Sequence, residues 1–191
     1  MHGKVTHASA PEKGLNPAGA IARTALFSQK LNALHQPRAF STITEMNAGT
    51  GDFGLAAGDG ALFLTLRGED ERTMKEMTEA IISCAKEEAE NAGLTIETSI
   101  SDAFPETRNT PAGTAKVLAC ASGLSLPICP MDQIWRASED FGHYLKHCEG
   151  AMFYVGNGEA YPPVHIGAYD FNDRILEPAV EMMKALAVMP R

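Results

Sequence analysis

The amino-acid sequence predicts a chain that mixes helices and strands and begins with an antiparallel, ferredoxin-like βαββαβ unit of the α+β class. Strand-like and helix-like segments follow one another in the order strand, helix, strand, strand, helix, strand over roughly the first hundred residues. Both helices of this unit have a start signal, at Asn16-Pro17 and at Asp70. The pattern changes beyond Phe104-Pro105, which predicts two parts, residues 1–108 and residues 109–191.

The first part is predicted to hold four strands and two helices. The strands have the alternating or continuous apolar patterns of half-buried strands and are expected at residues 3–8, 40–46, 61–67 and 94–100. The helices carry apolar residues at helical spacing, at residues 17–34 and 71–91, and Gly93 ends the second one. Two helices on one face of the sheet leave its other face and its edges accessible, which predicts a homodimer formed through this part.

The second part contains too few elements for a complete hydrophobic core. Helices are expected at residues 110–121, 139–148 and 174–188, a buried strand is expected at residues 151–155, and residues 124–129 form an apolar segment. A set this small does not readily fold alone. We therefore expect it to complete a larger α/β domain whose remainder lies in a missing segment or on another chain. The first predicted strand begins without a preceding cap or turn, which also predicts a fragment.

The composition excludes some classes of partner. The 191 residues include 45% hydrophobic residues and carry a formal net charge of −8, which predicts a globular chain. The acidic balance argues against binding to nucleic acid or to an anionic membrane, because both require a basic surface. The sequence contains neither a membrane span nor the apolar core of a signal peptide, so a cytoplasmic location is expected. The four cysteines form no CxxC pair and are expected to be buried free thiols.

The glycine-rich run from Gly49 to Gly54 matches the GxGxxG pattern of dinucleotide-binding proteins. That pattern binds pyrophosphate where it opens a helix. Here it continues into Gly58-Asp59-Gly60 and a predicted strand. A connection between two strands is therefore the favoured interpretation.

A proline-rich loop presents the histidine with the most constrained surroundings. Pro162-Pro163 fixes the approach to His165, and an Asx-rich turn follows it. A fixed imidazole between ordered elements suits a metal site or an acid–base site, although a lone histidine defines neither. His143 and His147 share one face of a predicted helix, as a metal pair would, but no HExxH frame surrounds them and a solvated face is favoured.

Four further positions could carry chemistry or serve structure. His7 and Arg67 stand at the ends of predicted strands, where the alternatives are a structural histidine and a surface ion-pair residue. Arg67 could instead present a fixed guanidinium to a carboxylate. Glu139 and Asp140 stand at a predicted helix start, where capping is the simpler interpretation.

Five short motifs occur in a fixed order along nearly the whole chain. They are Gly3-Lys4-Val5-Thr6-His7-Ala8-Ser9, Thr65-Leu66-Arg67, Phe104-Pro105 with Asn109, Ser138-Glu139-Asp140-Phe141, and Val164-His165 followed by Tyr169-Asp170-Phe171. Together they resemble the metal-dependent amidohydrolase and aminoacylase family of peptidases. Members of that family include hippurate hydrolase, indoleacetyl-amino-acid hydrolases and aminobenzoyl-glutamate hydrolases.

In that family, a ferredoxin-like lid domain interrupts an α/β catalytic domain and forms the dimer. The resemblance implies that residues 1–108 are the lid and that residues 109–191 are the C-terminal portion of the zinc-peptidase-like catalytic domain. It also implies a site for two divalent metal ions, zinc or manganese. By the same resemblance, His165 is a metal ligand, and His7 stabilises the oxyanion in trans. Arg67 and Asn109 are implied to bind the substrate. Glu139 and Asp140 are implied to support the metal site.

The function implied by the resemblance is hydrolysis of the amide bond of an N-acyl amino acid or a small peptide-like substrate. In this chemistry a metal-bound water attacks the carbonyl, and a donor such as His7 stabilises the oxyanion. The family's other metal ligands and its general base lie upstream of the lid and are absent from these 191 residues. The chain alone is therefore expected to retain no metal and to be inactive. The alternative is a non-catalytic dimerisation or interaction protein derived from the same family.

Overall fold

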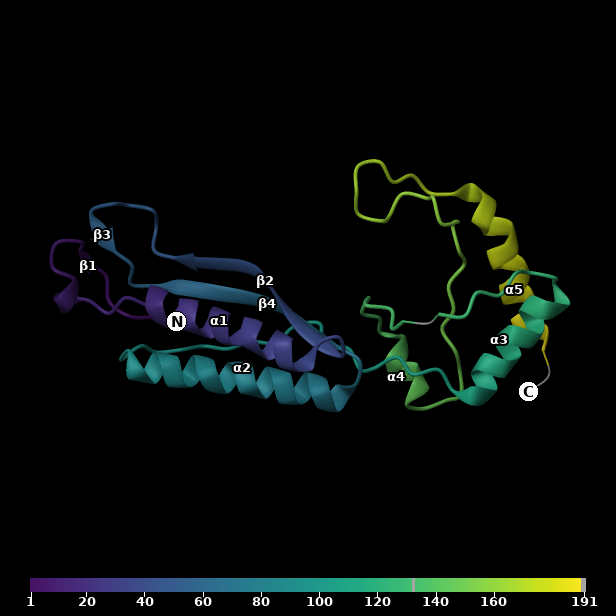
Figure 1. Ribbon diagram of the computed structural model, residues 1–191, viewed down its shortest axis with the longest axis horizontal. Coiled ribbons are helices and arrows are strands. Elements are labelled where there is room, and N and C mark those ends of the chain that lie inside the picture. Colours follow the sequence, from purple (N-terminus) through teal and green to yellow (C-terminus); the bar gives the residue numbers. More distant parts are fainter. Residues whose placement is uncertain (132, 190–191) are drawn as a thin grey trace. The chain divides into compact units, whose positions relative to one another are not determined.

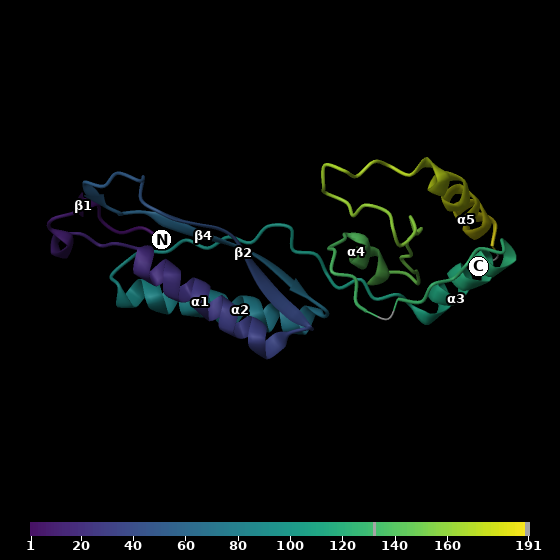
Figure 2. The same cartoon turned by 45° about the horizontal axis from the view of Figure 1, so that its top comes forward.

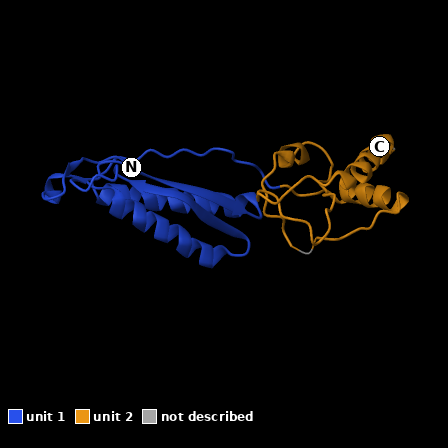
Figure 3. Ribbon diagram, turned by 90° about the horizontal axis from the view of Figure 1, so that it is seen from above, with its two compact units in different colours: residues 1–106 blue, residues 107–191 orange. Residues whose placement is uncertain are grey.

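The computed structural model describes residues 1–131 and 133–189. The chain separates into two compact units, residues 1–106 and residues 107–191 (Figure 3). The boundary expected from the sequence stands two residues later, after residue 108. None of the helices in the described part of the chain has the length and apolar character that a membrane span requires.

Unit 1 consists of two long helices and two small antiparallel sheets (Figure 1). β2 pairs with β4 along almost its whole length, and β1 pairs with β3. The elements in chain order are β1 (Thr6–His7), the 3₁₀ helix η1 (Pro11–Lys13), α1 (Ala18–His35), β2 (Ala39–Ala48), β3 (Leu55–Ala56), β4 (Gly60–Gly68) and α2 (Glu71–Asn91). The expected helices and the two central strands are therefore present, with bounds that differ by a few residues.

The outer strands of the predicted four-stranded sheet are much shorter than expected. The segment 94–100 contributes an isolated bridge between Thr95 and His2, and His2 also bridges to Asp59. These contacts are single bridges and do not extend into ladders. One physical reason is that Lys4 exchanges both backbone hydrogen bonds with Leu15, each at 2.9 Å, so these backbone groups are not available to the segment 94–100.

The glycine-rich run connects β2 to β4, as the sequence predicts. Gly49 and Gly51 adopt positive φ angles of 77° and 82°. These angles lie in the left-handed region, which glycine enters without a steric penalty. The backbone N–H of Gly49 donates to the carbonyl of Asp59 at 2.9 Å, so the run closes a loop between strands and opens no helix.

Both long helices cover the same face of the β2–β4 sheet (Figures 1 and 2). Met77 and Ala39 have no exposed surface, and Leu31 and Ile81 complete the buried cluster between the helices and the sheet. β4 contributes its alternate residues, Leu64 and Leu66, to this cluster. The apolar residues two positions apart on β4 and those at helical spacing on α2 therefore pack in one core, as the apolar pattern predicts.

The start of α2 is fixed by side chains at the base of the β2–β4 hairpin. Asp70 is the N-cap, and its carboxylate accepts from the backbone N–H of Thr73 at 2.8 Å. This hydrogen bond holds the pKa of the Asp70 carboxyl below its ordinary value, and the nearby Arg38 acts in the same direction. Arg38 contacts Asp70 at 2.6 Å and Glu69 at 3.0 Å. The N-cap expected from the sequence is therefore present.

Unit 2 is helical, and its extended segments form no strands in the described residues. Its elements are α3 (Pro111–Gly123), α4 (Phe141–Leu145), the 3₁₀ helix η2 (Asp173–Ile175) and α5 (Leu176–Val188). The buried strand predicted at residues 151–155 is wrong, because this segment has no strand partner and none of its residues is fully buried. It and the apolar segment 124–129 contact the α3–α5 core through Phe153, Leu124 and Leu126. The helix expected at residues 139–148 is confined to α4. The hydrophobic core of unit 2 is small, and its buried cluster within the described residues consists of Cys120, Ala121 and Met182.

The cysteine prediction is only partly correct. All four thiols are free, but Cys120 alone is buried, whereas Cys129 and Cys148 are exposed and Cys84 is intermediate. The reason is that Cys129 lies in an extended, exposed segment and Cys148 follows α4 at the surface. Partial burial raises the pKa of the Cys84 thiol.

Candidate functional site

His7 ends β1 and lies opposite Leu55 of β3. Its side chain is exposed, and its Nδ1 atom lies 2.7 Å from Oγ of Ser9. The backbone N–H of Ser9 donates to the same Nδ1 atom at 3.2 Å. A tight turn makes these contacts possible, because the N–H of Ala10 donates to the carbonyl of His7 at 2.9 Å. Sequence reasoning selected His7 and overlooked Ser9, although small residues directly after a strand-end histidine indicate such a turn.

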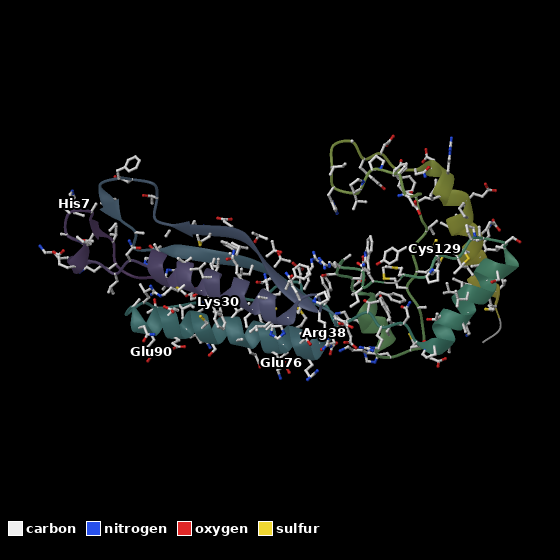
Figure 4. The ribbon with its side chains drawn as sticks, in the orientation of Figure 1. His7, Lys30, Arg38, Glu76, Glu90 and Cys129 are labelled. Atoms are coloured by element: carbon white, nitrogen blue, oxygen red, sulfur yellow. The ribbon has the colours of Figure 1, made fainter. Side chains whose placement is uncertain are left out.

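Arg67 lies near the other end of unit 1. It is a β4 residue opposite Phe40 of β2, and its neighbours Leu64 and Leu66 face the helices, so Arg67 belongs to the face that the helices do not cover. The eight residues from Gly60 to Arg67 span on the order of 20 Å at the usual rise per strand residue. Figure 4 shows the corresponding separation between His7 at the β1 end and Arg38 at the base of the hairpin. One copy of unit 1 therefore does not bring His7 and Arg67 together.

His165 lies at the tip of a loop whose base is closed by aromatic residues. The Tyr161 hydroxyl donates to the backbone carbonyl of Asp170 at 2.6 Å, and the rings of Tyr161 and Tyr169 meet edge to face at 6.1 Å. Desolvation raises the pKa of Tyr161, and the Asp170 carboxylate acts in the same direction. His165 itself is exposed and has a φ angle of 68°. The loop thus presents the imidazole outward on a closed base.

Asn109 connects the start of unit 2 to the segment that precedes the histidine loop. Its amide Nδ2 donates to the carbonyl of Met152 at 2.9 Å, and its Oδ1 accepts from the Met152 N–H at 2.8 Å. The side chain therefore pairs with one residue of an extended segment as a neighbouring strand would. Substrate binding by Asn109, which the resemblance implies, remains a prediction.

The next residue, Thr110, fixes the start of α3 against Gly150. Its hydroxyl donates to the carbonyl of Gly150 at 3.1 Å and accepts from the N–H of Gly113 at 3.1 Å. α3 and the backbone at Gly150 approach so closely that a Cβ atom on Gly113 would lie 2.3 Å from the Gly150 carbonyl carbon. This contact aligns α3 with the segment that leads to the histidine loop.

Replacing Gly113 by alanine is expected to lower the free energy of unfolding of unit 2 by about 1–3 kcal/mol, because the new methyl group overlaps backbone that cannot rotate away. Gly123→Ala is the matched control on the same helix, since a Cβ there meets nothing within 4 Å. The control is expected to stabilise by up to about 1 kcal/mol. Urea unfolding followed by fluorescence of Trp135, the single tryptophan, measures both changes. Equal effects of the two substitutions would contradict the close approach.

Glu139 and Asp140 directly precede α4. Asp140 occupies the N-cap position, but its side chain makes no capping hydrogen bond. Desolvation raises the pKa of Tyr154, and the Glu139 carboxylate adds to this effect. Trp135 lies against Tyr154 with the ring centroids 5.1 Å apart. Glu139 is therefore associated with an aromatic pair, and a supporting role at a metal site remains a prediction for both carboxylates.

These residues do not form a complete metal site. Within residues 1–131 and 133–189, no group of three or more histidine, cysteine, aspartate or glutamate side chains could hold a metal ion. Zinc sites use three or four protein ligands. The residues present thus do not by themselves fit the metal centre that the resemblance implies.

The fold of the chain is similar to that of solved proteins named as an aminohydrolase, an aminopeptidase and an amidase. The chain is similar to a protein from methicillin-resistant Staphylococcus aureus assigned as an aminohydrolase, with a TM-score of 0.78 and 21% identity over 98% of this chain and 49% of that one. It is also similar to aminopeptidase PepT from Bacillus cereus, with a TM-score of 0.73 and 15% identity over 97% and 48% of the two chains. A hydantoinase/carbamoylase family amidase from Burkholderia ambifaria matches with a TM-score of 0.66 and 18% identity over 100% and 46%.

At these identities the likeness establishes the fold. The chain spans about half the length of these three solved proteins. No protein-family model matches the chain, and no curated protein matches it either.

Proposed function

We propose that this chain forms the lid and the C-terminal portion of a metal-dependent amidohydrolase that cleaves the amide bond of N-acyl amino acids or small peptide-like substrates. The observation that supports the proposal is the extent of the fold match, because 98% of the chain corresponds to 49% of an aminohydrolase. The proposal requires a further segment, similar in length to this chain, that carries the remaining part of the active site.

His7 is the proposed oxyanion donor. Hydrolysis of an amide places negative charge on the carbonyl oxygen in the transition state, and a positioned N–H stabilises that charge where it develops. The exposed ring at the end of β1 can reach a substrate bound outside its own unit, and Nδ1 is already engaged by Ser9. This leaves Nε2 to face the substrate.

Arg67 is the proposed partner of the substrate carboxylate. Its guanidinium offers a planar set of donors that matches a carboxylate. Since His7 and Arg67 lie at opposite ends of unit 1, a substrate that contacts both must take them from two copies of the chain. This separation supports the role of His7 in trans.

The proposed homodimer forms through unit 1, along the outer edge of β2. One end of that edge is already occupied. The Asn32 side chain accepts from the N–H of Ser41 at 2.6 Å and donates to the carbonyl of Ser41 at 2.8 Å, as a neighbouring strand would. The pairing register of β2 with β4 shifts between Ile43 and Glu45. Pairing between two copies is therefore assigned to residues 45–48, beyond both features.

The proposed metal centre holds two ions, zinc or manganese, and draws most of its ligands from the further segment. His165 is its ligand from this chain. A ligand on an outward loop with a closed base can be delivered to a site formed elsewhere. Glu139 and Asp140 are proposed to support the site from the start of α4.

The test compares this chain with a longer product that adds the residues encoded directly upstream. Both are purified and assayed for release of the amino acid from N-acetyl and N-benzoyl amino acids, with zinc or manganese present. The longer product alone is expected to hydrolyse these amides, and a chelator should remove its activity. Sedimentation should give a dimer for both products.

Two results would contradict the proposal. The first is hydrolysis by this chain alone after addition of metal, which would mean that no further segment is needed. The second is a longer product that is dimeric and folded but hydrolyses no amide. That outcome favours the non-catalytic interaction protein, particularly if the upstream residues lack a His/Cys-x-Asp/His motif and a Glu-Glu pair.

A further inference from the structure

We infer that Ser9 is a positioning residue for His7, which holds the neutral imidazole in the tautomer that carries its proton on Nε2. The inference rests on the proposed role of His7 as an oxyanion donor and adds a residue that acts through it. Its basis is the pair of contacts that Ser9 makes with a single ring nitrogen, one from the backbone N–H at 3.2 Å and one from Oγ at 2.7 Å.

The backbone contact favours one tautomer. An amide N–H can only donate a hydrogen bond, so the Nδ1 atom that receives it must present a lone pair. A proton on Nδ1 would point at the Ser9 N–H and remove this hydrogen bond. In a neutral imidazole, the remaining proton is then on Nε2.

The hydroxyl contact strengthens the same arrangement. A serine hydroxyl can donate or accept, and its hydrogen rotates to suit the partner. Because Nδ1 already accepts from the N–H of Ser9, the hydroxyl must donate to it as well. Ser9 thus provides two donors to one acceptor, and the ring is held in a fixed orientation by a residue two positions along the chain.

The consequence lies on the opposite side of the ring. No hydrogen bond to Nε2 of His7 occurs in the part of the chain that the structure describes. The imidazole is exposed at the end of β1, as Figure 4 shows. Ser9 therefore gives this exposed histidine a defined proton and a defined direction, which is what stabilising an oxyanion requires before the reaction begins.

The test uses nitrogen NMR of the ring atoms in this chain, at an alkaline pH where imidazoles are neutral. The chemical shifts of Nδ1 and Nε2 report which nitrogen carries the proton. In the native chain we expect His7 to be more completely in the Nε2–H form than His35, which serves as the internal reference. Ser9→Ala removes the hydroxyl and keeps the backbone N–H of residue 9, so it should move the His7 shifts part of the way toward those of the reference. Ser9→Thr keeps the hydroxyl and should preserve them.

The amide signals of α1 and α2 show whether each variant is folded. A His7 ring protonated mainly on Nδ1 in the native chain would overturn the inference, and so would a Ser9→Ala variant whose ring shifts match the native ones. The measurement needs no activity, so a failure of the proposed hydrolase function and a failure of this inference are distinguished. In an active longer product, Ser9→Ala is further expected to lower kcat more than it changes KM.

Discussion

Replacing His7 by alanine in the longer, active product is expected to lower turnover by about 10²–10³-fold, with a smaller effect on KM. The physical reason is that an oxyanion donor acts on charge that is present in the transition state and largely absent from the bound substrate. The measurement is steady-state hydrolysis of an N-acyl amino acid by the purified dimer. His35→Ala is the matched control, because His35 ends α1 and lies outside the proposed site. It should leave turnover nearly unchanged.

A mixing experiment tests whether His7 acts in trans. A His7→Ala product and a His165→Ala product should each be inactive or nearly so. Dimers that contain one copy of each retain one site with both an intact metal ligand and a histidine supplied by the other copy. Partial recovery of turnover on mixing is therefore expected. A His7→Ala product that forms dimers and keeps native turnover would refute the oxyanion role, and mixed dimers without recovery would refute the arrangement in trans.

Replacing Met77 by alanine is expected to lower the free energy of unfolding of unit 1 by about 2–5 kcal/mol. Met77 has 0% exposed surface and shares a buried cluster with Ile81, also on α2, and with Leu31 of α1 and Ala39 of β2. Truncation removes buried apolar contacts and leaves a cavity that the surrounding helices and sheet can fill only in part. Trp135, the single tryptophan, lies in unit 2, so its fluorescence does not follow the unfolding of unit 1. Hydrogen exchange of the α1 and α2 backbone amides therefore measures the change in unit 1 within the intact chain.

Leu34→Ala is the control for this prediction. Leu34 lies in the same unit, near the end of α1, and is 78% exposed, so its truncation is expected to change the free energy of unfolding by less than about 0.5 kcal/mol. The comparison shows whether the loss of stability comes from burial or from truncating any apolar side chain. If the two substitutions had the same effect, the core of unit 1 would not lie between the helices and the β2–β4 sheet.

Local patterns along the chain were sufficient to predict the two helices and the central hairpin of unit 1. Asp70 is followed by a long amphipathic segment, and its side chain accepts from the N–H of Thr73 as an N-cap does. The alternation along β4 correctly divides residues that face the helices from those that do not. These features depend on neighbours close in sequence, so the order of residue types is enough to specify them.

The candidate site was less accessible to the same reasoning. The sequence led to His7, Arg67 and His165 through their positions at strand ends and in a rigid loop. It did not indicate that Ser9 engages the His7 ring, that Asn109 pairs with Met152, or that Asn32 occupies part of the β2 edge. Each of these contacts depends on how a turn or a tertiary contact orients one side chain, which residue type and spacing alone leave open.

The sequence by itself determined the mixed helix and strand character of the chain, the helices and central strands of unit 1, and the small core of unit 2. It did so because apolar periodicity, caps and turn residues act over a few positions. Only the tertiary structure decided how far the outer strands extend and where His7 and Arg67 lie relative to each other. Segments that are distant in sequence compete for the same backbone hydrogen bonds: Lys4 pairs with Leu15, whereas His2 bridges to Asp59 and Thr95. Which segments pair therefore depends on the folded backbone as a whole.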